Sequence, residues 1–317
     1  MSDALVVVRA GLLTTVQDLG RWGHQASGVP VSGAMDTYSL RLANALVNNP
    51  DGAAVLEITL LGPVLRAESA LSVAVAGATF ALTVDGAAVP HGAAFEVPAG
   101  AELRFGERRH GARAYLAVAG GIATPAVLGS RATHLVSRMG GLEGRALVAG
   151  DRVPVAAAAA GATSQRTSHP IPLVGPLGAG WLRVLLGPQD DWFTAAALDA
   201  LLGATFAVSA TSDRMGFRLD GPRLATRRAT ELVSEPVAFG ALQVPPGGAP
   251  ILLMADRQTA GGYPKIATVI TADLPLSGQL APGDAVRFTA CTRAEARSAL
   301  ITRERQLLRA MPDGARP

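Results

Sequence analysis

The sequence predicts a mainly β protein in two halves, with a few short helices and a C-terminal helix. Its 317 residues exceed one ordinary core and suggest two domains of about 150 residues each. Most apolar segments are short, as in barrels or sandwiches, and are bounded by glycine, proline or aspartate. GPVL at 62–65 recurs as GPRL at 221–224, and GDRVPV at 150–155 recurs as GDAVRF at 283–288. The recurrence favours two halves on one plan, the alternative being an accidental repeat of a turn followed by a strand.

The expected strands are apolar runs of four to seven residues that end at turn-forming residues. In chain order they are Ala4–Val8, Leu71–Ala76, Phe80–Val84, Glu102–Phe105, Ala114–Val118, Leu182–Leu186, Thr205–Ser209, Ile251–Met254, Ala267–Ile270 and Ala285–Phe288. These strands are spread over both halves. They are therefore expected to supply most of the two cores.

Three segments have the period of a helix instead of a strand. A helix over 36–48 begins at a capping aspartate, and a helix over 190–202 ends at a glycine. The third starts at Thr292, where Glu295 completes a capping box. The residues expected to face the core are Leu40, Ala43 and Val47 in the first helix, Phe193, Ala197 and Leu201 in the second, and Leu300, Leu307 and Met311 in the third.

The domain division follows from a change in composition between 156 and 180, where alanine, serine, threonine, proline and glycine replace strand alternation. We expect a first half at 1–160, a linker or surface excursion at 161–180, a second half at 181–291, and a C-terminal helix and tail at 292–317.

Composition excludes several classes of function. No apolar run approaches the eighteen or so residues needed to span a bilayer, and the start has no basic segment typical of a secretory signal. A single cysteine, Cys291, permits no internal disulfide, as expected for a reducing compartment. A net charge of +3 without basic clusters argues against nucleic acid. We expect a cytoplasmic protein with neither a membrane nor a nucleic acid as its partner.

Common catalytic and cofactor motifs are absent from the sequence. There is no G-x-G-x-x-G, no P-loop and no G-x-S-x-G, and the sole lysine, Lys265, precedes Ile266. No two of the five histidines are three to five residues apart, so no metal site is predicted and each histidine is expected at the surface or in a loop. Cys291 is either a nucleophile at a helix start or a small buried apolar side chain.

Four polar stretches with glycines remain as candidate sites. The first, 17–36, has no apolar period, so we expect it to have no packing duty and to be either a surface connection or part of a site. The second, 120–145, either cradles an anion or forms hairpin turns with solvated arginines. In the third, 212–216, Asp213 and Arg214 either fix a ligand or pair with each other, the pair being favoured. The fourth, DRQTAGGYPK at 256–265, follows a buried strand and is typical of a binding loop.

The ordered motifs QDLGR, GVPVSGAMD, GSR, SDRMG, GALQVP and DRQTAGGYPK resemble the biotin-dependent carboxyltransferase or allophanate hydrolase subunit 2-like family. That family includes KipA-type proteins and the C subunit of 5-oxoprolinase. The resemblance runs from about 6 to 288. It implies cyclophilin-like β-barrel domains, in agreement with the strand-rich halves inferred above.

The resemblance implies three functions. The first choice is a subunit of an ATP-dependent 5-oxoprolinase, which opens 5-oxoproline to L-glutamate as a hetero-oligomer with A-like and B-like companion subunits. The alternatives are the carboxyltransferase component of a biotin-dependent urea or allophanate-type system, and a non-catalytic regulator that binds a kinase-inhibitor protein. We expect ATP to be bound by the complex and not by this chain alone. Because the sole lysine lies in YPKIA, we expect no biotin to be attached to this chain.

Motif membership and residue type assign the site residues. Those nearest the chemistry are Asp256, Lys265 and Asp36. The residues expected to bind the substrate or an anion are Gln17, Arg21, Ser32, Arg131, Arg145, Arg214, Gln258, Thr259 and Tyr263. Arginines suit this role because a lactam phosphorylated on its oxygen would need groups that hold an anion, together with an activated water.

Overall fold

The structure is a computed structural model and describes residues 3–158, 180–228 and 232–310. The described residues form two compact units. The first unit comprises residues 3–21, 32–158 and 305–310, and the second unit comprises 22–31, 180–228 and 232–304. The expected linker at 161–180 lies almost entirely outside the described residues, and the predicted domain boundaries stay a prediction.

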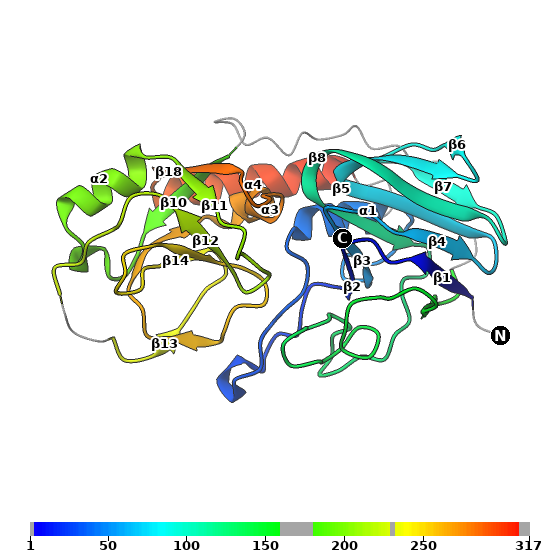
Figure 1. Cartoon of the computed structure of the whole chain (residues 1–317), viewed down its shortest axis with the longest axis horizontal. Coiled ribbons are helices and arrows are strands. Elements are labelled where there is room, and N and C mark those ends of the chain that lie inside the picture. Colours follow the sequence, from blue (N-terminus) through cyan, green and yellow to red (C-terminus); the bar gives the residue numbers. More distant parts are fainter. Residues whose placement is uncertain (1–2, 159–179, 229–231, 311–317) are drawn as a thin grey trace. The chain divides into compact units, whose positions relative to one another are not determined.

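The first unit is built on a nine-stranded antiparallel sheet that forms a half-barrel (Figure 1). Its main path is β2-β3-β8-β4-β1-β9, and β5 pairs with β8 and carries β6 and β7. The strands are β1 (Ala4–Arg9), β2 (Leu13–Gln17), β3 (Val55–Thr59), β4 (Val64–Ala67), β5 (Leu71–Val84), β6 (Ala87–Ala88), β7 (Ala94–Val97), β8 (Glu102–Val118) and β9 (Arg152–Pro154).

The long strand β8 holds this sheet together. Its start pairs with β4, where Leu65 opposes Leu103, and its end pairs with β3, where Ile58 opposes Ala114. Nearly its whole length pairs with β5, with register shifts between Gly77 and Leu82. The expected breaks inside 71–84 and 102–118 are therefore wrong, because these shifts let the glycine-containing and charged segments stay in the ladder.

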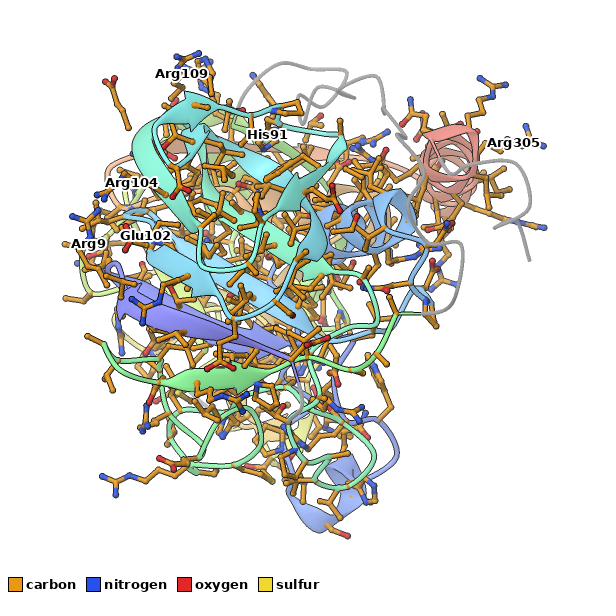
Figure 2. All side chains as sticks on the ribbon, turned by 90° about the vertical axis from the view of Figure 1, so that its right-hand side faces the viewer. Arg9, His91, Glu102, Arg104, Arg109 and Arg305 are labelled. Atoms are coloured by element: carbon orange, nitrogen blue, oxygen red, sulfur yellow. The ribbon has the colours of Figure 1, made fainter. Side chains whose placement is uncertain are left out.

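Buried and exposed side chains alternate at the start of β8, whereas residues 107–110 are all exposed and residues 112–118 are all buried. Leu103 and Phe105 are buried in the core, and the ring of Phe105 meets that of Phe80 edge-on with centroids 5.6 Å apart. Arg104 and Arg109 are exposed on the same strand, as is Arg9 on β1 (Figure 2). The alternation over 102–105 is the period-2 pattern of a strand with one buried face, and the buried run at the end fits a segment covered on both faces.

Helix α1 (Thr37–Leu46) is the helix expected after the opening loop. Leu40, Ala43 and Val47 are all buried, as predicted. Asp36 is the N-cap, and its carboxylate accepts from the backbone N–H of Ser39 at 2.9 Å. This cap satisfies one of the backbone donors that a helix start leaves unpaired.

The second unit is a closed seven-stranded barrel in the order β10-β17-β14-β15-β12-β11-β18 (Figure 1). A parallel pair between β10 and β18 closes it, with Leu182 opposite Phe288. Its strands are β10 (Trp181–Leu186), β11 (Phe206–Val208), β12 (Gly216–Asp220), β14 (Ala241–Gln243), β15 (Ile251–Leu253), β17 (Lys265–Val269) and β18 (Ala285–Ala290). A separate ribbon pairs β13 (Glu235–Pro236) with β16 (Ala260–Gly261).

The expected helix over 190–202 is divided in two. A 3-10 turn, η2 (Asp190–Trp192), precedes α2 (Ala195–Gly203), because the Thr194 hydroxyl accepts from the N–H of Ala197 and starts a new helix. Phe193, Ala197 and Leu201 are buried as predicted.

The remaining helical elements are η1 (Gln25–Ser27), η3 (Thr271–Asp273), α3 (Leu274–Gly278) and the C-terminal α4 (Arg293–Ala310). The predicted capping box of α4 is confirmed, since Glu295 accepts from the Thr292 N–H at 2.7 Å and donates its own N–H to the Thr292 hydroxyl at 3.2 Å. Leu307 is buried and Leu300 half-buried, whereas Met311 lies outside the described residues.

The predicted fold class is confirmed, because both units are β-structures of the barrel type. The helices are few and short, except for the C-terminal α4. Among the described residues, every helix is too short or too polar to cross a lipid bilayer.

Candidate functional site

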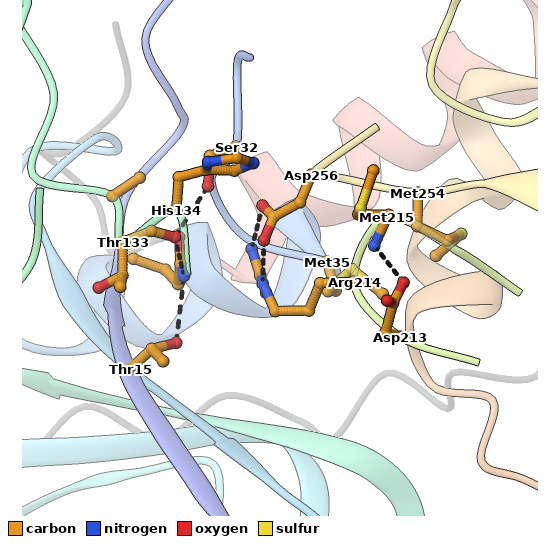
Figure 3. Close-up of polar contacts among 12 residues, drawn as sticks. Thr15, Ser32, Met35, Thr133, His134, Asp213, Arg214, Met215, Met254 and Asp256 are labelled. Atoms are coloured by element: carbon orange, nitrogen blue, oxygen red, sulfur yellow. Dashed lines mark hydrogen bonds and ion pairs between the residues drawn. The ribbon is translucent and has the colours of Figure 1, made fainter. Parts of the chain in front are cut away.

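Five polar side chains from the two ends of the opening stretch, Gln17, Asp18, Arg21, Ser32 and Asp36, are buried in the first unit. Gln17 donates from Nε2 to the Thr133 carbonyl and to the Thr15 hydroxyl, each at 3.1 Å. Ser32, with φ of 58°, donates to the same Thr133 carbonyl at 2.9 Å (Figure 3). The expectation that residues 17–36 have no packing duty is therefore wrong for these side chains, because they hold a distant loop by its backbone.

Asp18 and Arg21 extend this arrangement. The Asp18 carboxylate accepts from the N–H of Gly20 at 2.8 Å, the Ser130 hydroxyl at 2.7 Å and the N–H of Arg131 at 2.6 Å. Arg21 is 1% exposed and donates to the carbonyls of Val127 and Ala132. The sequence predicts an anion contact for Arg21, but in the structure its guanidinium binds main-chain oxygens.

Two glycines allow these loops to approach closely. Gly33 has φ of 90°, and a Cβ there would lie 2.8 Å from the nitrogen of Gly20. A Cβ on Gly140, with φ of 70°, would lie 2.6 Å from Nη2 of Arg21. The glycines of the first and second polar stretches therefore fit a folded backbone and need no ligand to explain them.

The two arginines predicted in the second stretch bind their own loop. Arg131 donates from Nε to the Thr124 carbonyl at 2.7 Å. Arg145 pairs with Asp151 at 2.7 Å and with Glu143 at 2.9 Å. The hydrogen bond from Arg145 lowers the pKa of Asp151, with a smaller contribution from the N–H of Val148. An anion-binding role for Arg131 and Arg145 stays a prediction, and these contacts favour the turn interpretation.

Asp36 belongs to a buried network in the first unit. Its oxygens accept from the N–H and hydroxyl of Ser39, and its own N–H donates to the Tyr115 hydroxyl at 2.8 Å. Tyr115 donates in turn to Glu57 at 2.8 Å. Burial, followed by the charge of Glu57, raises the pKa of Tyr115 well above its ordinary value. The geometry makes Asp36 a helix cap, and its predicted catalytic role remains untested.

His134 is a polar group that sequence reasoning missed. It is 3% exposed and lies in a loop, so the expected loop position is confirmed but the side chain is not at the surface. Its Nδ1 accepts from the N–H of Ser137 at 3.2 Å, which assigns the ring proton to Nε2. Among the described residues, neither Nε2 of His134 nor Oε1 of Gln17 has a hydrogen-bond partner. The carbonyl that Gln17 binds precedes His134 by one residue, so both atoms belong to one loop region.

In the second unit, the third and fourth polar stretches meet through a buried ion pair (Figure 3). Arg214 donates to Asp256 from Nε at 3.0 Å and from Nη2 at 3.1 Å, with both side chains at most 5% exposed. The favoured pair of Asp213 with Arg214 is wrong, because Asp213 accepts from the N–H groups of Met215 at 2.8 Å and Gly216 at 3.2 Å. A turn that uses Asp213 in this way leaves Arg214 to reach the strand-end aspartate.

Lys265 forms a second charged group with residues that the sequence did not single out. Its ammonium contacts the Glu235 carboxylate, which also accepts from Nε2 of Gln189 at 2.7 Å. The backbone N–H of Lys265 donates to Oε1 of Gln189 at 3.1 Å. The hydrogen bond from Lys265 lowers the pKa of Glu235. No local pattern marked Glu235, because its partner comes from β17, 30 residues further along the chain.

Two glutamines of the second unit, Gln243 and Gln258, also bind each other. Gln258 donates to Gln243 at 3.1 Å, and Gln243 donates to the Tyr263 carbonyl at 3.4 Å. Gln243 opposes Lys265 in the β14–β17 ladder. Thr259 contributes its carbonyl to the N–H of Val237, whereas the side chain of Tyr263 is 45% exposed. Three polar groups of the second unit are thus defined, namely Arg214 with Asp256, Gln258 with Gln243, and Lys265 with Glu235 and Gln189, and we call them together the barrel cluster.

The barrel cluster contains groups that can bind and polarise a small polar molecule. It offers one guanidinium, one ammonium, two carboxylates and three carboxamides within a single unit. Among the described residues no three metal-ligating side chains gather. Cys291 is half-buried, and burial raises the pKa of its thiol, which favours the small structural side chain over the nucleophile.

Comparison with known proteins identifies the family. The profile described as carboxyltransferase domain, subdomain A and B, matches residues 27–290. The chain belongs to this carboxyltransferase-domain family. It is 41% identical over 302 residues to the 5-oxoprolinase C subunit of Escherichia coli strain K12, covering 95% of this chain and 96% of the relative.

Family members also occur inside larger proteins. The chain is 32% identical to urea amidolyase of Saccharomyces cerevisiae over 93% of its own length and 17% of that protein. The crystal structure of the Kluyveromyces lactis urea amidolyase superimposes with a TM-score of 0.90 at 32% identity, covering 98% of this chain and 20% of the other. This carboxyltransferase-domain protein therefore corresponds to about one fifth of that solved chain.

Proposed function

We propose that this protein is a subunit of an ATP-dependent 5-oxoprolinase that opens 5-oxoproline to L-glutamate. The observation that carries the proposal is the match to the C subunit of 5-oxoprolinase, which extends over nearly the full length of both chains. A relative from Haemophilus influenzae with the same name is 36% identical over 89% of each chain. Similarity that spans both units supports a shared role for the whole chain and not for one domain alone.

The reaction is assigned to a complex of this chain with A-like and B-like companion subunits. The names of both relatives describe a subunit, which supports the presence of companion chains. ATP is assigned to the complex and not to this chain alone, because the sequence has neither a P-loop nor a G-x-G-x-x-G motif.

The barrel cluster is the part of this chain that we assign to the chemistry. Opening the lactam breaks its C–N bond and adds water, and phosphorylation of the amide oxygen by ATP would make the carbonyl carbon more reactive. Arg214 and Lys265 provide positive charge for such an oxyanion, while Asp256 and Glu235 hold those cations in place. Gln243 and Gln258 provide amide donors and acceptors that suit a lactam.

Biotin is not assigned to this chain. Lys265 is 6% exposed, lies in β17 and contacts Glu235, which makes it a poor acceptor for covalent attachment. Any biotin used in a related reaction would come from a separate carrier.

Transfer of a carboxyl group from carboxybiotin is the second candidate function. It is favoured by the family profile and by the TM-score of 0.90 to a urea amidolyase. The same cations would serve, since a carboxyl group in transfer also carries negative charge.

Reconstitution separates these proposals. The purified chain, mixed with its companion subunits, is expected to release glutamate from 5-oxoproline only when ATP is present. Lack of turnover by an assembled complex of folded chains would reject the 5-oxoprolinase proposal. Carboxyl transfer from supplied carboxybiotin to urea by the same preparation would instead establish the second candidate.

A further inference from the structure

Arg257 is a buried guanidinium that neither the motifs nor the barrel cluster has so far explained. Its side chain is 8% exposed, and it follows Asp256 in the loop after β15, which ends at Leu253. Nε donates to the Val237 carbonyl at 3.3 Å and Nη1 to the Met254 carbonyl at 3.4 Å. The guanidinium carbon lies 5.5 Å from the centre of the Phe239 ring. Both distances exceed the usual range of about 2.7–3.2 Å, so these hydrogen bonds are weak.

The charge of Arg257 lacks a carboxylate in direct contact. Within the described residues no Asp or Glu oxygen lies within 4.0 Å of its guanidinium, and Nη2 donates to no residue. The adjacent Asp256 is engaged in the bidentate pair with Arg214. Burial lowers the pKa of Arg257 to about 10, and the charge of Asp256 opposes that decrease only in part.

Two other arginines of the same unit, Arg214 and Arg183, are each paired with a carboxylate. Arg214 has the carboxylate of Asp256, and Arg183 donates to Asp273 from Nε at 2.9 Å and from Nη2 at 2.6 Å. A buried charge without a counter-charge costs free energy of folding, whereas a paired one is compensated. Arg257 is therefore a buried cation that no carboxylate side chain among the described residues contacts directly.

We propose that Arg257 is the residue of the second unit that binds the anionic group of a ligand, with Nη2 as the available donor. The identity of the ligand rests on the proposed function, because 5-oxoproline carries a carboxylate next to its lactam. A phosphoryl group has the same oxyanion chemistry. The guanidinium lies against the Phe239 ring and donates weakly from two nitrogens to carbonyls, which leaves Nη2 as the donor for an anion.

Arg257→Met tests this role, because methionine keeps length and packing but removes charge and donors. If the buried charge serves a ligand, the free variant should unfold at the same temperature as the wild type or higher. Its Kd for the anionic ligand should increase at least about tenfold, which corresponds to the loss of one charge-assisted hydrogen bond. Arg257→Lys, which keeps the charge but not the fork, should lose less affinity than Arg257→Met.

Calorimetric titrations of the chain and of the reconstituted complex provide the measurement. The probes are 5-oxoproline, 2-pyrrolidinone, which has the lactam without the carboxylate, and inorganic phosphate. An effect of Arg257→Met on 5-oxoproline but not on 2-pyrrolidinone identifies the substrate carboxylate as the ligand. An effect on phosphate alone identifies a phosphoryl group. Arg218→Met, at an exposed position of β12, is the matched control and should bind as the wild type does.

Two results would overturn the proposal. One is unchanged affinity of Arg257→Met for both anions in both preparations. The other is a lower unfolding temperature with unchanged affinity, which would make Arg257 a structural clamp for the Val237 and Met254 carbonyls. The proposed function can fail separately. If the complex binds these anions through Arg257 but never releases glutamate, the anion site is supported and the 5-oxoprolinase proposal is rejected.

Discussion

Two polar, glycine-containing stretches look alike in the sequence but differ in where their hydrogen bonds go. In the first unit, Gln17, Arg21 and Ser32 donate to main-chain carbonyls of residues 127–133. In the second unit, Asp256 and Lys265 bind other side chains, Arg214 and Glu235.

The difference separates a scaffold from a candidate site. A side chain bound to a backbone carbonyl fixes a loop, and replacing that partner requires the loop to move. A side chain bound to another charged side chain can exchange its partner for a ligand while the backbone stays in place. The barrel cluster is therefore the better candidate for chemistry, and the opening stretch is the framework of the first unit.

The largest expected effect comes from Arg214→Ala in the barrel cluster. It leaves the buried carboxylate of Asp256 without the guanidinium, so we expect a loss of about 3–5 kcal/mol in the free energy of unfolding. Urea unfolding followed by fluorescence measures this. Activity of the reconstituted complex should also be lost.

A double variant separates stability from function in that pair. Arg214→Met combined with Asp256→Leu should recover most of the lost stability, because both charges are removed together. Glutamate release should stay absent. A double variant with wild-type activity would show that this pair is only structural and would break the contrast between the two stretches.

Asp18→Ala tests the other side of the comparison. It removes the acceptor of three hydrogen bonds, from the N–H groups of Gly20 and Arg131 and from the Ser130 hydroxyl, so we expect a loss of about 2–3 kcal/mol in stability. Activity per folded molecule should be retained, as measured at a temperature where circular dichroism shows the variant folded. Asp18→Asn, which keeps one acceptor oxygen, should lose less stability. Complete inactivity of a folded Asp18→Ala would place the first unit in the chemistry.

Tyr115→Phe is expected to cost about 1–2 kcal/mol, because the buried Glu57 carboxylate and the N–H of Asp36 both lose the hydroxyl. Its ionisation can be observed directly. The pKa of Tyr115 is raised well above 10, so in an alkaline titration of tyrosine absorbance the phenolate of this residue should appear last. The variant should lack that late component. If the variant instead lacked a tyrosine component that titrates at lower pH, the buried network would be contradicted.

The smallest effect concerns the pH dependence of Glu235. Its folded pKa lies below the ordinary 4.5, so its contribution to stability is present above pH 4.5 and is lost as the pH falls through the folded pKa. The side chain is 38% exposed, and solvent screening limits the contribution to a few tenths of a kcal/mol. The stability difference between wild type and Glu235→Gln should therefore shrink below pH 4.5. A difference that grows on acidification would contradict the contact with Lys265.

The fold class was predictable from the sequence because it depends on local patterns. Short apolar runs, the capping aspartate before α1 and the Thr292–Glu295 capping box are all encoded within a few residues. The boundaries inside β5 and β8 were not predictable, because the ladder continues through Gly77, which opposes Ala114, and through Phe80, which opposes Arg108, only with register shifts that no local pattern encodes.

The sequence marked polar residues that make side-chain contacts but not the partners of those contacts, and their role in a site stays a prediction. DRQTAGGYPK marked Asp256, Gln258 and Lys265, and the barrel cluster contains all three. The choice of Asp256 over Asp213 by Arg214 depends on a turn 42 residues away from the aspartate. Glu235 and His134 carry no local signal, since their burial and contacts arise only when distant strands and loops assemble.

The parallel pairing of β10 with β18 has a consequence for the order of events during synthesis. These strands are the first and the last of the barrel along the chain, so 181–186 cannot find its partner before 285–290 has been made. Contacts of such large sequence separation are slow to form. A nascent chain that ends before residue 285 holds six of the seven strands and keeps two open edges, each able to pair with another chain. The second unit is thus most exposed to misassembly just before its translation is complete.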